Sequence, residues 1–556
     1  MRGRTLVTVL AGVLAFLPCA HGQQPLLQLQ GQPYFGGSMT LHVTAPSDIG
    51  DIVWLGVGLD PLPLDAPVPT SKGQWYIGNL LIPMLIGAIP SNGRLDMPFT
   101  MPPATPGIEG TVIALQAYVP PALSNPATLP LDLLYYSPAE AVVLTSPQPM
   151  LGADFGDRVA AGDLNGDGAV DVVVGAWFED FQGIDKSGRA YVFWGPAYTS
   201  SIAIDPPTPH PAGEFGSGLA VSDFDGDGLA DLMVSDGSGY PLSPLGPGHL
   251  HFYIGGATFS PTPSLSVASV LSGLGADSFG RRHAIGDLNG DGFVDVAVGL
   301  ANAPVGSLTL AGQVHVYWGP TFSAYQELFS PEPEANANFG TSLAIGDFDG
   351  DGIMDLVEGS DRVDAGGVQD VGNVHAFKGG SLGLLLTIPY PLTPVAFASF
   401  GGELETADID LDGIAEIVVS DELDHVFVFE FASLPEYSVI PKPYSGSNPL
   451  GAFGVHIAAG DSNGDGLVDL AIGNTFEGPL SCPIGDGGEV QVALGPYFAT
   501  FHNVYDKARA CGDLFGFDFT AVDLDGDGSK ELIVGASVAD DGGLQNSGHI
   551  TILFTG

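Results

Sequence analysis

A short acidic segment recurs seven times in this chain, and its residue types are those that hold a hard cation. The first copy, Asp163–Asp171, is DLNGDGAVD, with side-chain oxygens at positions 1, 3, 5 and 9 and glycine at position 6. Ca²⁺ takes about six to eight oxygen ligands, and alternate side chains of a tight loop can point inward to supply them. A backbone carbonyl at position 7 would add one more. The segment therefore predicts a Ca²⁺-binding loop.

The other six copies keep the same ligand positions, so we expect up to seven structural Ca²⁺ ions. Glutamate replaces aspartate at position 9 of the fifth and seventh copies. Leu411 replaces the glycine found at position 4 of the other copies, and the fifth loop is therefore predicted to bind most weakly. The predicted ligands, with the position-7 residue offering its carbonyl, are Asp163, Asn165, Asp167, Ala169, Asp171; Asp223, Asp225, Asp227, Leu229, Asp231; Asp287, Asn289, Asp291, Phe293, Asp295; Asp347, Asp349, Asp351, Ile353, Asp355; Asp408, Asp410, Asp412, Ile414, Glu416; Asp461, Asn463, Asp465, Leu467, Asp469; and Asp523, Asp525, Asp527, Ser529, Glu531.

Solvated turns and EF-hands are the alternatives to such loops. A single copy would be explained as well by a solvated turn, but seven copies with one ligand spacing favour Ca²⁺. An EF-hand requires glutamate at position 12 between two helices, and position 12 is glutamate only in the fourth copy, at Glu358. Because the segments around that copy, SLAIG and DLVEG, are typical of strands, we interpret this match as accidental.

The loops belong to a longer repeat, since their first aspartates are 60, 64, 60, 61, 53 and 62 residues apart. Each unit contains four short apolar segments separated by turns, which is typical of a propeller blade. The last unit lacks a fourth strand, while Ala141–Pro147 has no unit of its own, so this segment is expected to close the ring. A Phe-Gly pair stands eight residues before the first aspartate of every copy, at Phe155, Phe215, Phe279, Phe339, Phe400, Phe453 and Phe515. We predict an all-β chain with a seven-bladed propeller over residues 139–556, closed by strand 141–147.

The Phe-Gly pair, the acidic loop and the strand that follows it resemble the FG-GAP repeats of the integrin alpha-subunit propeller. The resemblance covers residues 141–556. This chain departs from it after the second strand, where Gly175-Ala176-Trp177 and Gly535-Ala536-Ser537 have no proline. The resemblance implies an exported binding or adhesion module, and related repeats occur in many exported bacterial proteins.

Composition and the first residues indicate an exported protein. Glycine (80) and proline (45) are abundant and only 14% of residues are charged, which suits many short strands joined by turns. Residues 1–22 have a basic start, an apolar run and Ala-His-Gly, as a secretory signal peptide does. That apolar run, about 12 residues, is too short for a spanning helix. A net charge of −49 disfavours nucleic acid and anionic membrane as partners. We expect a secreted or cell-surface protein without membrane insertion.

Three further features lie outside the repeated loops. Residues 23–138 lack the repeat, and their alternating apolar segments predict a small β-sandwich of unknown role. Cys482 and Cys511 fall in connections on one face of the propeller and are expected to form a disulfide, with two free thiols as the alternative. His251, His315 and His375 occupy equivalent third-strand positions in different blades. They are too far apart to share one ion, so packing roles are expected.

These features favour a binding or adhesion module for a protein or glycan partner. We find no nucleophile elbow, phosphate-binding loop or HExxH motif, and we predict no enzymatic activity. The alternatives are an exported polysaccharide lyase- or phospholipase-like enzyme that carries these repeats and a structural envelope protein. Screening against polysaccharides for both binding and product release separates the binding module from the enzyme.

Overall fold

The fold is known from a computed structural model of the whole chain. It describes residues 141–237, 247–271, 279–431, 437–442, 452–475, 488–495, 498, 500–504, 513–540 and 545–553, and before residue 141 it describes the backbone of strands only. The chain divides into two compact units, residues 1–140 with 500–504 and residues 141–499 with 505–556. The signal segment 1–22, Cys482 and Cys511 lie outside the described residues. No helix in the described ranges has the length and apolar character to span a bilayer.

The strands that the structure describes before residue 141 form two main sheets and a hairpin. All their pairings are antiparallel. The sandwich packing of these sheets remains a prediction. The sheets, in order of pairing, are β1 (Leu26–Gly31), β2 (Ser38–Thr44) and β7 (Arg94–Thr100); β6 (Ile77–Ala88), β3 (Ile52–Pro61), β8 (Ala114–Val119) and β9 (Ala122–Leu123); and β4 (Val68–Thr70) with β5 (Gly73–Trp75).

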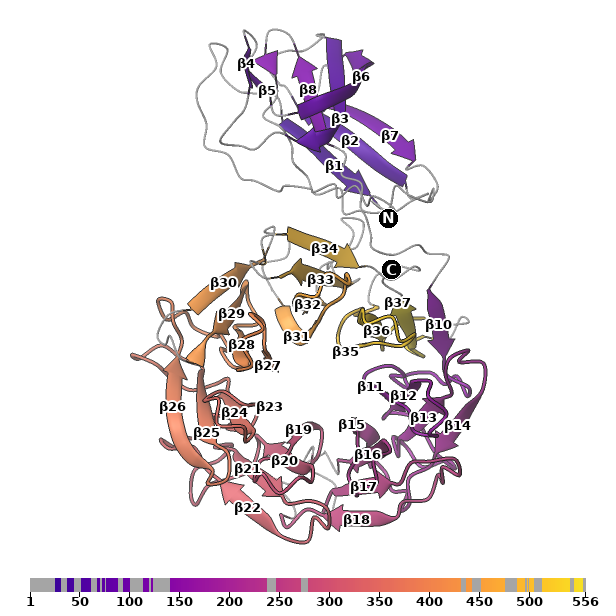
Figure 1. The fold of residues 1–556 in the computed structure, drawn as a ribbon, viewed down its shortest axis with the longest axis vertical. Helices are drawn as coiled ribbons and strands as arrows, with labels where there is room; N and C mark the ends of the chain where they lie inside the picture. The colour runs from indigo at the N-terminus through magenta and orange to yellow at the C-terminus, as the bar shows by residue number, and fades with distance from the viewer. Residues whose placement is uncertain are drawn as a thin grey trace. The chain divides into compact units, whose positions relative to one another are not determined.

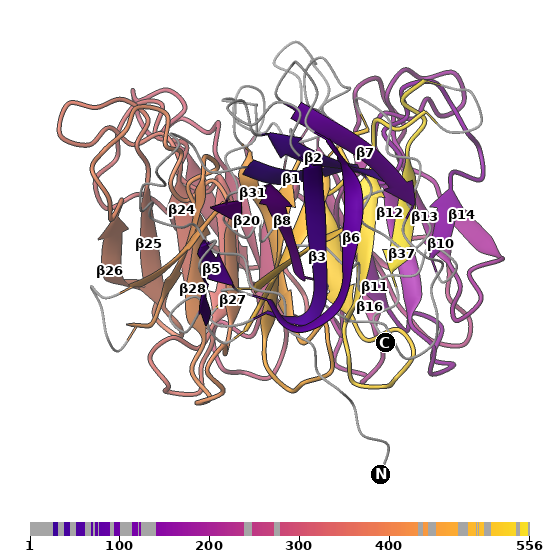
Figure 2. The same cartoon turned by 90° about the horizontal axis from the view of Figure 1, so that it is seen from above.

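Seven four-stranded antiparallel sheets, the blades, form a ring (Figure 1). The first strand of each blade lies innermost and contacts the first strands of both neighbouring blades. The strands run roughly along the ring axis in the side view (Figure 2). The seven-bladed all-β propeller predicted from the repeat is confirmed. From the innermost strand outward, blades one to seven are β11 (Val159–Gly162), β12 (Asp171–Ala176), β13 (Arg189–Phe193), β14 (Ser201–Ile204); β15 (Phe215–Ser222), β16 (Asp231–Asp236), β17 (His249–Tyr253), β18 (Leu265–Ala268); β19 (Arg282–Gly286), β20 (Asp295–Leu300), β21 (Gln313–Tyr317), β22 (Tyr325–Leu328); β23 (Ser342–Gly346), β24 (Asp355–Ser360), β25 (Asn373–Lys378), β26 (Gly383–Pro389); β27 (Leu404–Ala407), β28 (Glu416–Ser420), β29 (His425–Phe429), β30 (Tyr437–Pro441); β31 (Phe453–Gly460), β32 (Asp469–Asn474), β33 (Glu489–Leu494), β34 (Thr500–Val504); and β35 (Phe519–Val522), β36 (Glu531–Ala536), β37 (His549–Leu553), β10 (Val142–Thr145).

Burial within a blade follows the position of the strand. The second strand is buried throughout and is mostly apolar after its first acidic residue, as in β12, DVVVGA; β16 and β24 also bury Asp236 and Glu358. The outermost strand is largely exposed, as in β22, YQEL. A strand covered on both faces needs a continuous apolar run, and the second strand of every blade lies between two neighbouring blades.

The ring closes through strand pairing between the two ends of the propeller sequence. The segment expected to close it, residues 141–147, contains β10, which pairs antiparallel with β37. Val142 stands opposite Ile552, and Thr145 stands opposite His549. Blade seven thus takes three strands from the end of the chain and its outermost strand from the beginning, which leaves the ring without an open blade.

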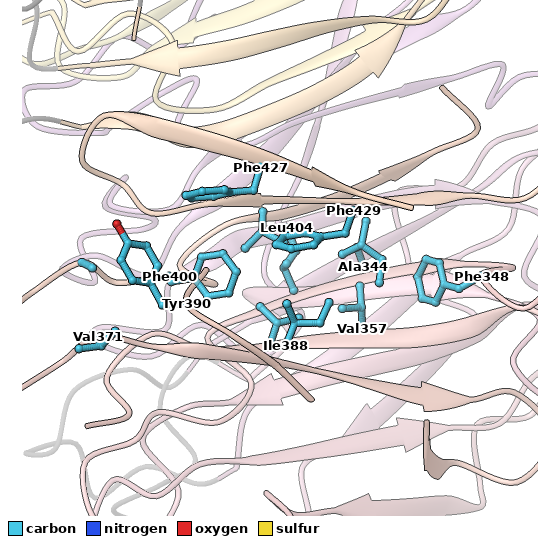
Figure 3. Close-up of a cluster of buried hydrophobic side chains, with 14 residues drawn as sticks. Ala344, Phe348, Val357, Val371, Ile388, Tyr390, Phe400, Leu404, Phe427 and Phe429 are labelled. Atoms are coloured by element: carbon cyan, nitrogen blue, oxygen red, sulfur yellow. The ribbon is translucent and has the colours of Figure 1, made fainter. Parts of the chain in front are cut away.

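The phenylalanine of each Phe-Gly pair fills the space between neighbouring blades. All seven are completely buried. In the cluster between blades four and five, Phe400 packs edge-on against Phe427 and Tyr390 at centroid distances of 5.5 and 5.6 Å (Figure 3). The backbone N–H of Phe400 also donates to the carbonyl of Val371 in blade four, 3.0 Å away. This residue therefore joins adjacent blades by packing and by hydrogen bonding.

The glycine of the pair allows this close approach. Gly401 has φ +88°, a conformation that costs a side-chain-bearing residue about 1–2 kcal/mol. A Cβ on Gly359 of the preceding blade would lie only 2.0 Å from the Gly401 carbonyl oxygen. Two glycines in neighbouring blades are therefore required by direct backbone contact.

Candidate metal centre

All seven acidic loops lie at the same end of the propeller, because each connects the first strand of a blade to the second. In the first loop one carboxylate organises the backbone. Asp163 Oδ1 accepts hydrogen bonds from the amides of Gly166 (2.7 Å) and Asp167 (3.1 Å), and Asp163 Oδ2 accepts one from Gly168 (2.8 Å). Side-chain oxygens at positions 3 and 5 each accept from the amide two residues later. These contacts bend the chain around its own acidic groups.

The position-9 carboxylate is buried and ties the loop to the rest of the blade. Asp171 is fully buried; its Oδ2 accepts from the amide of Leu164 at 3.0 Å and its Oδ1 from the amide of Gly195 at 2.9 Å. Gly195 follows the third strand, and a Cβ there would lie 2.2 Å from the carbonyl oxygen of Val170. The same glycine contact is made by the position-9 aspartates of blades two, three, four and six, through Gly255, Gly319, Gly379 and Gly495. The sequence analysis missed these glycines.

Burial makes the negative charge at position 9 costly. Desolvation, followed by the charges of other loop acids, raises the pKa of Asp171 and of Asp295 to about 6 and that of Glu416 to about 7. Burial raises the pKa of Glu531 as well. Each carboxylate sits in a cluster of acids that repels its ionised form. A cation bound in the loop would remove this penalty.

The predicted ligands come together in space. Carboxylate oxygens of three acids lie within 4.8 Å of one another in the loops of blades two, four, five and seven. In blades two, five and seven the three are positions 1, 3 and 9; in blade four they are positions 1, 3 and 5. Blades one, three and six have asparagine at position 3, so an amide oxygen replaces one carboxylate there. The described loops are therefore acidic groups of a kind that could hold a metal ion.

A lysine occupies the loop of blade four. The Lys378 ammonium forms ion pairs with Asp349 and with Asp351, the latter at 2.7 Å. Its hydrogen bond and charge lower the pKa of Asp351. Lys378 immediately precedes the glycine that contacts position 9, where blades one and three have tryptophan. It supplies a positive charge at the place where a metal ion would bind.

Leu411, which the sequence analysis singled out in the fifth loop, adopts the backbone conformation of the glycines it replaces. Its φ is +64° and its side chain is exposed. The loop therefore keeps its shape at the cost of a left-handed leucine, about 1–2 kcal/mol. The blade-four loop, with its lysine, is a further candidate for weak metal binding that the loop sequence alone did not indicate.

Glu358, the position-12 residue that mimics an EF-hand, is directed away from its loop. It is fully buried on β24 and pairs with His375 Nδ1 at 2.9 Å across the neighbouring strand. It also accepts from the amide of Gly340 at 2.6 Å. The interpretation of the EF-hand match as accidental agrees with this placement and with the strands on both sides of the loop.

A network of ion pairs lies at the opposite end of the innermost strands, and the sequence analysis missed it. His456 Nδ1 lies 2.8 Å from Glu403 Oε1, and His456 Nε2 lies 3.6 Å from Asp518 Oδ1. Arg282 and Arg158 extend it, at 3.4 Å from Glu403 and 3.9 Å from Asp518. We call these five residues the axial ion-pair network. Each is the third residue after a Phe-Gly phenylalanine, a regularity by which the sequence could have revealed them.

The protonation of His456 should make stability depend on pH. Burial alone would lower the pKa of His456, but the charges of Glu403 and Asp518 outweigh burial and raise it to about 9. A folded-state pKa above the ordinary 6.5 contributes stability that is complete below pH 6.5 and is lost as pH rises through 9. We expect the free energy of unfolding in saturating Ca²⁺ to fall by on the order of 2 kcal/mol between pH 6.5 and 9.5.

Guanidinium unfolding at the two pH values measures this loss. The variant His456→Gln should show a flatter profile, because it lacks the titrating imidazole. An equal loss in the variant would contradict the assignment to His456.

Comparison with known proteins agrees with this geometry. Residues 163–234 and 287–358 match the family model for the FG-GAP-like repeat, and residues 453–493 match that for the FG-GAP repeat. Human phosphatidylinositol-glycan-specific phospholipase D is 30% identical over 34% of this chain and 23% of its own length. Integrin alpha-V of Gallus gallus is 28% identical over 37% of this chain and 20% of its own length. Integrin alpha-PS5 of Drosophila melanogaster is 36% identical over 28% of this chain and 15% of its own length.

The chain thus carries FG-GAP repeats in an integrin-alpha-like propeller, as the Phe-Gly and loop spacing predicted. It aligns with less than a quarter of the length of each of these relatives. The activities of the whole relatives therefore do not follow from the match.

Proposed function

We propose that this chain is an exported, calcium-binding β-propeller that acts as a binding module for an extracellular protein or glycan. The observation that carries the proposal is a separation of charge and chemistry between the two ends of the propeller. One end carries the seven acidic loops, whose spacing is repeated in every blade. The other end carries basic and aromatic side chains that differ from blade to blade. A repeated end suits structural ions, and a variable end suits recognition of one partner.

Calcium is the ion best matched to the loops. All the proposed ligands are oxygen atoms from carboxylates, amides and carbonyls, which suit a hard cation. The predicted ligand set is that of the sequence analysis, positions 1, 3, 5, 7 and 9 of each loop. Its proposed role is structural, because it would neutralise acids that are otherwise held together by backbone hydrogen bonds and, in blade four, by Lys378. Export, proposed from residues 1–22, would expose the loops to millimolar Ca²⁺.

Lys378 provides a direct test of the calcium assignment. Because its ammonium pairs with two proposed ligands of the blade-four loop, Lys378→Leu should raise the affinity of that loop for Ca²⁺ by about tenfold, equivalent to about 1.4 kcal/mol. Calcium titration calorimetry would show one site strengthened while the others are unchanged.

The matched control is Lys442→Leu, which removes a lysine distant from the acidic loops along the chain. An unchanged isotherm in Lys378→Leu would contradict calcium binding in the blade-four loop. An equal strengthening in Lys442→Leu would show a general charge effect instead of a local one.

The proposed partner surface is a basic–aromatic patch, defined here as Trp177, Phe178, Lys186, Arg281 and Arg282. Lys186 Nζ lies 3.9 Å from the ring centroid of Phe178, and the Arg281 guanidinium lies 4.2 Å from that of Trp177. Lys186 and Arg282 are exposed. Trp177 and Phe178 stack on each other at 4.0 Å. Trp177 is buried and Phe178 is half-buried, so the cations are the most accessible part of the patch and the aromatic rings support them, an arrangement that suits anionic groups.

The patch stands out because positive charge is scarce in this chain. Of the nine lysines and arginines that the structure describes in the propeller, seven lie at this end and two at the end of the acidic loops (Arg158, Lys186, Arg189, Arg281, Arg282, Arg362 and Lys442, against Lys378 and Lys530). The net charge of the chain is −49. An anionic glycan or an acidic protein segment would be attracted to this end alone.

The test is a binding screen with the full exported chain in millimolar Ca²⁺, using neutral and acidic polysaccharides and extracellular proteins as immobilised probes. We expect saturable binding that Lys186→Ala/Arg282→Ala weakens at least about tenfold. Lys186 is exposed, and Glu403 keeps its pair with His456 when Arg282, whose side chain is 43% exposed, is removed, so the variant should fold. Lys442→Ala is the control for loss of positive charge and should bind as the wild type does. Binding unaffected by the double variant, or no binding by the wild type, would overturn the proposal.

Product release in the same screen separates binding from catalysis. Release of saccharide or of a lipid-linked product by the wild-type chain would favour the enzyme alternative over the binding module. A chain that binds no soluble probe yet stays with cell-surface fractions would favour the structural envelope alternative. Both outcomes count against the proposed function.

A further inference from the structure

A His-x-His sequence on β17 faces an aspartate on the neighbouring strand. β17 is HLHFY, and because side chains alternate along a strand, His249 and His251 project to the same face. Asp236 ends β16 and stands directly opposite His249 in the antiparallel pairing, while Val234 stands opposite His251. Strand register therefore brings one carboxylate beside two imidazoles.

The three side chains converge on a small volume. Asp236 Oδ1 lies 3.1 Å from His249 Nδ1, and Asp236 Oδ2 lies 3.2 Å from His251 Nε2. One ligand atom from each residue lies within 4.8 Å of both others. The two imidazole rings are stacked, with centroids 5.5 Å apart and planes 26° apart. Such a set can surround one ion with two nitrogens and one oxygen.

The charge of Asp236 calls for a cation. Asp236 is 3% exposed, and within the described residues its ion pairs are with these two histidines and with no lysine or arginine. Burying an ionised carboxylate without a counter-charge is costly. The positive charge must therefore come from a proton on an imidazole or from a metal ion held between the three groups.

A fourth residue orients one of the imidazoles. His251 Nδ1 lies 2.8 Å from the hydroxyl of Ser266 on β18. If Nδ1–H donates a hydrogen bond to that hydroxyl, Nε2 is unprotonated and its lone pair points toward the Asp236 carboxylate. Histidine ligands of metal ions are commonly held in this way by a hydrogen bond at the other nitrogen. His251 is buried and hydrogen-bonded, whereas the His249 side chain is 31% exposed and reaches solvent.

Blade three offers a natural comparison. There His315 occupies the position of His251, but Gln313 and Leu300 replace His249 and Asp236. His315 Nε2 lies 3.2 Å from Gln313 Oε1, and the residue at the position of Asp236, Leu300, has no carboxylate; Glu327 stands opposite His315 on β22, where blade two has Ser266. The histidine alone is therefore a packing residue in blade three, as the sequence analysis expected. In blade two the same position takes part in a cluster that the sequence analysis did not recognise.

We propose that Asp236, His249 and His251 form a binding site for Zn²⁺, distinct in kind from the oxygen-only acidic loops. Imidazole nitrogens suit zinc and leave the acidic loops to the harder ion. Three protein ligands leave one tetrahedral position for water or for a group of a bound partner. The ion would neutralise Asp236 and link β16 to β17 in blade two, at the end of the propeller opposite the acidic loops.

The experiment titrates the full chain with Zn²⁺ at pH 7.5 in the presence of saturating Ca²⁺, so that the acidic loops are already filled. Isothermal calorimetry should show one Zn²⁺ per chain at this site. His249→Gln and Asp236→Asn should each weaken Zn²⁺ binding at least about 100-fold. Loss of a residue that only hydrogen-bonds to a ligand already costs about 10–100-fold, and these two residues are ligands themselves. Ser266→Ala should weaken Zn²⁺ binding about tenfold. His315→Gln should leave it unchanged.

A second measurement identifies the ligands. Co²⁺ substituted for Zn²⁺ should give a visible absorption spectrum of a tetrahedral nitrogen–oxygen site, and His249→Gln should abolish it. Because His251 still pairs with Asp236, that variant should stay folded in Ca²⁺ without zinc. Zinc binding that persists unchanged in His249→Gln, or its absence in the wild type at micromolar Zn²⁺, would overturn the proposal and leave a protonated His–Asp cluster.

Discussion

Removing Ca²⁺ from the folded chain should lower its free energy of unfolding by about 3–10 kcal/mol. At about 1 mM free Ca²⁺ and a Kd of about 10⁻⁴–10⁻³ M, each site contributes on the order of 0.4–1.4 kcal/mol, and seven loops repeat the same ligand pattern. The physical reason is the buried position-9 carboxylate in each loop, whose ionised form is disfavoured by burial and by neighbouring acids. Differential scanning calorimetry with and without a chelator measures the change.

Variants of single loops measure how much each Ca²⁺ site contributes to the free energy of unfolding. Asp287→Asn removes one position-1 carboxylate and should cost only the share of one site, with one fewer Ca²⁺ in the titration. Asp185→Asn, an exposed aspartate outside the loops, is the matched control and should leave the calcium effect intact. Equal melting temperatures with Ca²⁺ and with chelator would contradict the structural role proposed for the ion.

Replacing Asp518 should be the most damaging single change in the axial ion-pair network. Asp518 accepts a hydrogen bond from the amide of Val159 at 2.8 Å and lies near both Arg158 and His456. Because Val159 belongs to blade one and Asp518 to blade seven, this carboxylate joins the two blades at which the ring closes. Asp518→Asn leaves two partly buried cations, Arg158 and His456, short of one counter-charge. We expect a loss of about 3 kcal/mol or more, as for other broken buried pairs.

Chemical unfolding in saturating Ca²⁺ measures this loss, and a double-mutant cycle tests its origin. His456→Gln/Asp518→Asn should destabilise less than the sum of the two single variants. Asp518→Asn alone leaves the His456 imidazolium without one of its counter-charges, and this imidazolium is absent from the double variant. Additive effects would contradict direct coupling between the two side chains. A loss within about 0.5 kcal/mol of zero in Asp518→Asn would show that solvent compensates the network.

Strand content, blade number and the acidic loops followed from the sequence alone, for a local reason. Each loop is shaped by hydrogen bonds that Asp163 and its equivalents accept from amides three to five residues later. Each Phe-Gly pair keeps one distance from its loop in all seven copies. Periodic patterns of this range are preserved in the sequence, and the propeller is the assembly that repeats them in a closed ring.

The functions assigned to individual side chains depended on contacts that no local pattern encodes. Glu358 matches an EF-hand position in sequence, yet strand register turns it toward His375. Lys378 reaches the blade-four loop from the end of the third strand, 27 residues beyond Asp351. His251 differs from His315 only through the residues that face it across the strands.

The sequence by itself determined that seven acidic turns recur in a β-propeller, because each turn and each Phe-Gly pair is built from neighbouring residues. Only the tertiary structure decided which charges meet. Arg158 and Asp518 are far apart in the chain, and closure of the ring between blades one and seven brings them within 3.9 Å. Strand pairing likewise selects Asp236 as the partner of His249 and His251. Long-range pairing is set by the packing of whole blades, which no single repeat contains.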